Sequence, residues 1–190
     1  LIPKLHRKAF DVVLKTPLLK LNHDEVPDIE DIASQYGFGF RMDAIIHPTV
    51  SGSLAPVEHR IPAERAASLA MRQPAIRNQL RCAYHDATVP FDDKTGILPC
   101  SAGIYSFQVA ADLTVNPCSI FRRSFGDLLL ETFRDEWQRL CVFRSQPRGV
   151  SADECMKCPL VSICVNCPGI AHLHGKGSDF VDSYVCEYTK

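Results

Sequence analysis

The spacing of the cysteines constrains this chain more than any other sequence feature. Seven of the nine cysteines form one ordered series: Cys100, Cys118, Cys155, Cys158, Cys164, Cys167 and Cys186. Four of them read C-x2-C-x5-C-x2-C among Pro159, Pro168 and Gly169, which indicates a loop. Thiolates this closely spaced are typical of a metal centre, and sulfur ligands select zinc or iron–sulfur clusters over hard cations. Seven thiolates exceed one four-coordinate site and nearly suffice for two.

Composition narrows the class of protein. A chain of 190 residues is long enough for one domain or two small ones. Its net charge of −1 gives no support for a nucleic-acid partner, and no run of about 18 apolar residues predicts a membrane partner. The odd cysteine count, with none in the first 81 residues, favours a local metal-binding module in a reducing, cytoplasmic compartment. A disulfide-stabilised extracellular domain is the less favoured alternative.

The N-terminal part predicts a β-α-β unit. Residues 10–18 and 38–46 are apolar runs typical of strands, and a helical apolar period lies between them. Asn22 and Asp24 offer N-cap oxygens, and Gly37 is a natural helix end. Such a unit implies two parallel strands joined by a right-handed crossover. Because parallel strands are normally buried within a larger sheet, this part resembles the tail of a larger α/β domain.

The remaining elements alternate with loops. We expect a loop over 48–61, a helix from Pro62 to about Arg72, irregular chain over 83–99, a hairpin of 105–110 with 113–115, a helix over 126–143, and a cysteine loop from Val150 onward. The long helix has an apolar face predicted to comprise Leu129, Phe133, Trp137, Leu140 and Cys141. Its charged residues predict a solvated face: Arg134, Asp135, Glu136 and Arg139.

Residues 99–190 resemble the SPASM module of radical S-adenosylmethionine enzymes. That module reads C-x9–15-G-x4-C, then C-x2-C-x5-C-x3-C, then a final cysteine. Here FRDEWQRL lies in the first gap, CMKCPLVSICVNCPG supplies the central run, and YVCEY supplies the last cysteine. The segment from VVLKTPLLKLNHDE to HRI resembles, by hydrophobic pattern, the last β/α units of the enzyme barrel. The implied class is α/β (α+β overall), with a partial (β/α) barrel over 1–61, a linker over 62–98 and a SPASM domain over 99–190.

Three departures from the family pattern stand out. The family's glycine falls on Leu113, so the hairpin turn is expected to be built differently. The last spacing of the run is x2 rather than x3, which shortens the reach of Cys167. The barrel's C-x3-C-x2-C motif is absent from the printed sequence, so this chain alone is not expected to cleave S-adenosylmethionine. The resemblance therefore implies the C-terminal part of a longer enzyme, whose full-length form would bind that cofactor.

The resemblance also implies how two [4Fe–4S] clusters would be held. Cys100, Cys118 and Cys167 would bind the first auxiliary cluster, with Cys82 as a candidate fourth ligand or an open iron in its place. The second cluster would be bound by four residues: Cys155, Cys158, Cys164 and Cys186. Cys141 is more plausibly a small buried hydrophobe, and His172 and His174 are weaker ligand candidates.

The sequence supports three hypotheses for the function of the chain. The leading hypothesis is the auxiliary-cluster part of a peptide- or protein-modifying radical enzyme, an oxidoreductase whose clusters serve electron transfer and substrate positioning. Its partners would be a peptide or protein substrate and a redox donor such as ferredoxin or flavodoxin. The second is a zinc-stapled binding module without catalysis, although five residues between the C-x2-C pairs is shorter than the usual zinc spacing. The third is the disulfide-stabilised domain.

Overall fold

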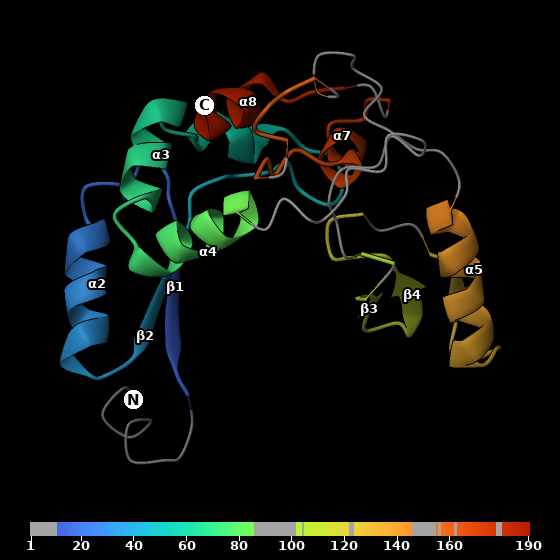
Figure 1. Cartoon of the computed structure of the whole chain (residues 1–190). Helices are drawn as coiled ribbons and strands as arrows, with labels where there is room; N and C mark the ends of the chain where they lie inside the picture. Colours follow the sequence, from blue (N-terminus) through green and yellow to red (C-terminus); the bar gives the residue numbers. More distant parts are fainter. Residues whose placement is uncertain are drawn as a thin grey trace.

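A computed structural model describes residues 11–85, 102–103, 105–121, 124–145, 155, 157–161, 163–177 and 180–190. The described elements are β1 (Val13–Pro17), α2 (Val26–Gln35), β2 (Gly39–Asp43), the 3-10 helix η1 (Ala55–His59), α3 (Ala63–Ala70), α4 (Pro74–His85), β3 (Gln108–Val109), β4 (Thr114–Asn116), β5 (Gly126–Asp127), α5 (Phe133–Ser145), α7 (Pro168–Leu173) and α8 (Ser183–Thr189). The chain is thus a mixed α/β protein with two small sheets (Figure 1).

The predicted β-α-β unit is confirmed. Strands β1 and β2 pair in parallel, from Val13 opposite Gly39 to Pro17 opposite Asp43, and α2 packs against both. The chain leaves α2 through Gly37, whose φ of 65° is the left-handed conformation that glycine adopts without strain. The two strands and the helix between them therefore form where the sequence predicted them. Among the described residues it carries no third strand.

The predicted N-cap of α2 is wrong. The cap position is Glu25, and no side chain there accepts a hydrogen bond. Asn22 instead binds the preceding turn: its side-chain oxygen accepts from the backbone N–H of Leu19 at 2.9 Å, and its amide donates to the carbonyl of Pro17 at 3.0 Å. The turn over residues 20–25 places Asn22 too early to cap the helix, so its polar atoms are satisfied locally.

The main apolar core lies in the N-terminal part. Its buried members are Leu18, Val26, Met42, Ala44, Ile61, Ala66, Leu69 and Ala70. Helix α8, the last element of the chain, packs against α3, and its Tyr188 lies against this core. Figure 1 shows α8 beside α3, so the end of the sequence closes the core formed by its beginning.

Helix α4 is not among the predicted elements. The sequence analysis ended the preceding helix at about Arg72, and the structure separates α3 from α4 by a short turn. Pro74 begins α4, a position where its missing N–H leaves no bond unmade. Ile76 and Leu80, four residues apart, are half-buried on one side of the helix. Proline followed by this spacing is the signal that could have predicted α4.

The predicted hairpin gains a third strand. β3 and β4 pair antiparallel as expected, and β5 pairs antiparallel with the other edge of β4. Leu113 in the β3–β4 turn adopts a φ of 66°, the left-handed conformation that favours glycine. The residue at the family's glycine position therefore has a glycine-like backbone conformation. A leucine here takes the backbone conformation that is open to glycine, and accepts the local strain.

Helix α5 begins later than predicted. Residues 126–132 form β5 and a turn rather than helix, and Leu129 is 71% exposed instead of lying on an apolar face. At the true start, Thr132 donates to the carboxylate of Asp135 at 2.6 Å and accepts from the N–H of Asp135 at 3.4 Å. A Thr-x-x-Asp sequence of this kind is a helix-start signal that the sequence analysis missed.

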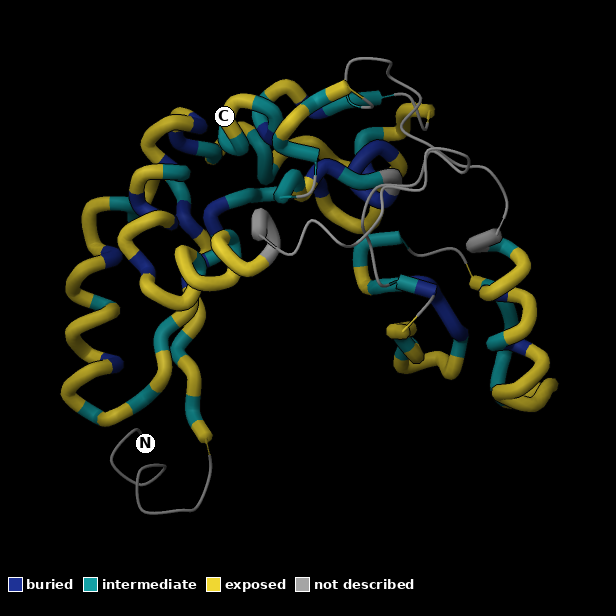
Figure 2. Tube along the Cα trace, in the orientation of Figure 1, coloured by how far each residue is buried: buried dark blue, intermediate teal, exposed yellow. Residues whose placement is uncertain are grey.

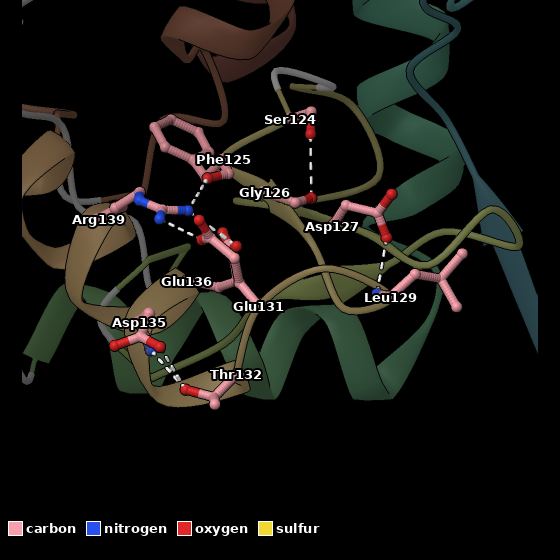
Figure 3. Close-up of polar contacts among 10 residues, drawn as sticks. All are labelled: Ser124, Phe125, Gly126, Asp127, Leu129, Glu131, Thr132, Asp135, Glu136 and Arg139. Atoms are coloured by element: carbon pink, nitrogen blue, oxygen red, sulfur yellow. Dashed lines mark hydrogen bonds and ion pairs between the residues drawn. The ribbon is translucent and has the colours of Figure 1, made fainter.

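A buried carboxylate holds α5 against β5, contrary to the predicted solvated face. Glu136 is fully buried, and a Cβ on Gly126 would overlap its carboxylate. Arg139 donates to Glu136 Oε1 at 2.8 Å and to the carbonyl of Phe125 at 3.3 Å, and it also pairs with Glu131 (Figure 3). Burial raises the pKa of Glu136, as does its hydrogen bond with Glu131, while Arg139 opposes both effects.

Aromatic rings join the hairpin to α5. Phe107 lies with its ring centre 5.8 Å from that of Trp137 and 4.8 Å from that of Phe133.

Cys141 is exposed, so the prediction of a buried small hydrophobe is wrong. The region beyond residue 150, expected to lack regular structure, contains α7 and α8. Figure 2 shows that α7 is largely buried. In the described part of the chain, no helix has the length and apolar character needed to cross a bilayer.

Candidate metal centre

The described cysteines fall into two environments. Cys82 on α4 and Cys141 on α5 are exposed. Six other predicted ligands are half-buried: Cys118, Cys155, Cys158, Cys164, Cys167 and Cys186. Cys82, Cys118, Cys141, Cys158, Cys164 and Cys186 form no disulfide. Cys100 lies outside the described residues. Free thiols at these positions count against a disulfide framework.

Helix α8, which carries Cys186, lies beside the part of the loop that carries Cys164. The hydroxyl of Thr189, on the same helix as Cys186, donates to the sulfur of Cys164 at 3.9 Å. Burial raises the pKa of the Cys186 thiol; Cys164 raises it further, Lys190 lowers it, and Cys158 again raises it. The structure thus brings the last cysteine of the sequence to the central run.

The loop itself turns repeatedly through backbone hydrogen bonds. The N–H of Cys158 donates to the carbonyl of Cys155 at 3.2 Å, and the N–H of Cys164 donates to the carbonyl of Val161 at 3.3 Å. The N–H of Asn166 also donates to the sulfur of Cys164 at 3.5 Å. N–H donors to sulfur favour the thiolate form that a metal requires.

Cys167 lies near the loop that carries Cys118. A Cβ placed on Gly169 would lie 3.5 Å from the sulfur of Cys167, 3.2 Å from Ile120 and 3.3 Å from Phe121. Phe121 in turn donates its backbone N–H to the sulfur of Cys118 at 3.2 Å. Gly169 therefore lies between Cys167 and the loop of Cys118, and its missing side chain permits their close approach. These are the two described cysteines that the resemblance assigns to the first cluster.

A buried amide lies in the cysteine loop. Asn166 is 2% exposed, and neither its Oδ1 nor its Nδ2 has a hydrogen-bond partner in the described structure. A buried amide without partners is costly, so such a group is expected to meet a ligand or an ordered water. Its N–H₂ group, between Cys164 and Cys167 in the chain, is the kind of donor that contacts cluster sulfurs. The donor set is therefore chemically suited to iron–sulfur clusters.

The described thiols do not form a closed site. Within the described ranges, no three His, Cys, Asp or Glu side chains lie close enough together to hold a metal ion. His172 is exposed and packs edge-on against Phe121, with ring centres 5.1 Å apart. The cluster assignments therefore stay predictions, supported by which cysteines are neighbours.

A buried ion pair fixes this region to the N-terminal part. Arg60, after η1, donates to Asp182 through Nη2 at 2.8 Å and through Nη1 at 3.3 Å. Its Nε donates to the carbonyl of Ile46 at 2.7 Å, and its guanidinium lies 4.5 Å from the ring centre of Tyr184. The side chains of Arg60 and Asp182 are only 10% and 6% exposed. Asp182 also accepts from the N–H of Tyr184 at 3.1 Å and so caps α8.

Sequence reasoning missed this ion pair, because its partners are 122 residues apart and neither belongs to a motif. Burial disfavours the Asp182 carboxylate, but the hydrogen bonds and charge of Arg60 prevail and lower its pKa. His174 Nε2 lies 3.3 Å from Asp182 Oδ2, which explains its burial better than a role as a metal ligand. Burial, followed by the charge of Arg60, lowers the pKa of His47, which completes the polar cluster.

Comparison of the chain with protein-family models, curated proteins and solved structures finds no match. The class that the fold defines is thus a mixed α/β chain with a cysteine-rich C-terminal part.

Proposed function

We propose that this chain is the auxiliary-cluster part of a radical S-adenosylmethionine enzyme that modifies a peptide or protein. The observation that carries the proposal is that the cysteine loop makes two separate contacts. Thr189 of α8, the helix of Cys186, donates to the sulfur of Cys164, while Cys167 lies across Gly169 from the loop of Cys118. A single zinc staple would use adjacent C-x2-C pairs together. The contact of Cys164 with α8 and the approach of Cys167 to the Cys118 loop instead match the interleaved ligation that the resemblance implies.

In this proposal each part of the chain has a distinct role. The loop and α8 would hold one [4Fe–4S] cluster, and the Cys118 loop with Cys167 would hold part of the other. Such clusters supply one-electron transfer when bound. Asn166 would donate to sulfur from a site closed to water, which sets the stability of the reduced form. The Arg60–Asp182 pair would keep the cluster region fixed against the α/β part, in a cytoplasmic enzyme served by a ferredoxin or flavodoxin.

The test is anaerobic reconstitution with iron and sulfide, followed by iron analysis and electron paramagnetic resonance of the reduced protein. We expect about eight irons per chain, with Cys158→Ala and Cys118→Ala each removing about four. Cys141→Ala is the matched control, because it deletes an exposed thiol and should leave the iron content unchanged. Retention of one or two zinc ions with no iron uptake would overturn the proposal in favour of the zinc-stapled module.

A further inference from the structure

A cavity of about 430 Å³ opens between α3, α4 and α8. This volume falls within the range of about 300–1,000 Å³ that is usual for ligand sites. Its apolar wall comprises Ala67, Met71, Leu80, Ile163 and Tyr188. The remaining lining residues are polar or cationic, and they are Arg77, Arg81, Thr189 and Lys190. The cavity can therefore take apolar groups while charged side chains stand at its mouth.

The charge around this cavity is one-sided. Arg77 and Arg81 are exposed and lie one turn apart on α4, so both project from the same side of the helix. Lys190 follows α8 on the facing wall. None of the described lining residues is Asp or Glu, and none of the ion pairs seen between described residues involves these three cations. Since the whole chain has a net charge of −1, this is a local concentration of positive charge.

The cavity adjoins the candidate metal centre. Thr189 lines the cavity and donates its hydroxyl to the sulfur of Cys164 at 3.9 Å. Ile163, another lining residue, directly precedes Cys164 in the chain. A ligand bound in the cavity would therefore lie beside the loop that carries the thiols.

We propose that this cavity binds a peptide segment in which apolar side chains are flanked by carboxylates. The apolar wall would bury the apolar side chains, while the guanidinium groups of Arg77 and Arg81 would pair with the carboxylates, which match their planar fork. The inference rests on the proposed function only for the peptide nature of the ligand. The cavity then docks the substrate next to the cluster region.

The test is isothermal titration calorimetry of the full 190-residue chain with the peptide acetyl-Gly-Glu-Leu-Phe-Glu-Gly-amide. Two control peptides replace both Glu by Gln, or Leu-Phe by Ser-Ser. We expect binding of the first peptide and at least about tenfold weaker binding of each control, because charge and burial both contribute. Added salt should weaken the binding of the acidic peptide by screening its charges. No heat with the first peptide, or equal affinity for the Gln peptide, overturns the inference.

Protein variants locate the site. Arg77→Glu with Arg81→Glu should weaken binding by more than about tenfold, since attraction becomes repulsion. The matched control, Arg65→Glu with Arg72→Glu, makes the same charge change at exposed positions outside the cavity and should alter Kd by less than about twofold. Equal weakening by the two pairs would overturn the assignment to this cavity. The control peptides decide the matter independently if the first double variant does not fold.

Iron analysis of the same preparations separates this inference from the proposed function. Iron uptake without peptide binding overturns the docking site and leaves the cluster proposal intact. Peptide binding that is sensitive to Arg77→Glu, in a protein that takes up no iron, supports the docking site and overturns the cluster proposal.

Discussion

The N-terminal part and the cysteine-rich part are stabilised in different ways. The first has a continuous apolar core, with every buried member of the described cluster between Leu18 and Ala70. Among the described residues of the second part, the buried apolar side chains are scattered rather than gathered in a cluster of this kind. Small regions without a sufficient core usually need a metal or disulfide to remain folded. In the proposed function, metal clusters bound by the thiols would therefore stabilise the second part in place of an apolar core.

Removal of the metal is the strongest test of this contrast. In the iron-loaded protein, chelation should lower amide protection in α7 and the β3–β4 hairpin by more than about hundredfold, because metal binding and folding are coupled. Protection in α3 should stay unchanged, since its core contains no cysteine. Hydrogen exchange followed by mass spectrometry measures both regions in one sample. Equal loss in both would show that the two parts fold as one unit.

The ion pair that joins the two parts should show the next largest effect. Asp182→Asn leaves the Arg60 cation buried without its partner, so the free energy of unfolding should fall by about 3–5 kcal/mol. Urea unfolding followed by circular dichroism measures the loss. The control is Arg60→Met with Asp182→Leu, which removes both charges and should recover most of the stability. A small effect of Asp182→Asn would mean that the two parts are held together elsewhere.

The same cluster predicts how stability depends on pH. The pKa of His47 is lowered from its ordinary value of 6.5, so the unfolded chain binds the proton first and stability falls as the pH drops below about 6.5. The pKa of Asp182 is lowered from 3.8, so its contribution is complete above that pH and is lost as the pH falls through the folded value. Melting temperatures from pH 8 to 3 should show two declines, by linkage. Only the lower one should vanish in Asp182→Asn.

Within the cysteine-rich part, substitutions at two glycines compare the cost of a steric overlap with the cost of an unfavourable backbone conformation. Gly126→Ala would place a Cβ in the space of the Glu136 carboxylate and should cost about 1–3 kcal/mol, as overpacking does. Gly175→Ala meets nothing within 4 Å and has only its φ of 64° to accommodate, so it should cost about 1 kcal/mol. Thermal unfolding compares them. A smaller loss at Gly126 would show that α5 can move away from β5.

The smallest expected effect is a gain in stability. Leu113→Gly relieves a left-handed residue in the β3–β4 turn and should raise the free energy of unfolding by up to about 1 kcal/mol. The entropy of glycine in the unfolded chain offsets part of that gain. Denaturant unfolding with the loaded protein measures it. Destabilisation would indicate that the half-exposed leucine side chain contributes more packing than its turn costs.

Local patterns predicted much of the fold. Apolar runs and Gly37 were enough for β1, α2 and β2, and alternation was enough for the hairpin. Two-residue strands such as β5 carry too little sequence to be recognised. Glu136 looked solvated because helical periodicity cannot reveal a strand that covers one side of the helix. The cysteine spacing predicted the candidate site, whereas the Arg60–Asp182 pair depends on tertiary approach over a separation that no local pattern encodes.

The packing of Trp137 on Phe107 and Phe133 has an optical consequence. Trp137 is the single tryptophan of the chain, so tryptophan fluorescence excited at long wavelength arises from the α5–hairpin contact alone. The N-terminal core contributes nothing to that signal. A red shift of the emission would therefore report opening of this contact while the rest of the molecule is still folded, and a nearby iron–sulfur cluster would quench it.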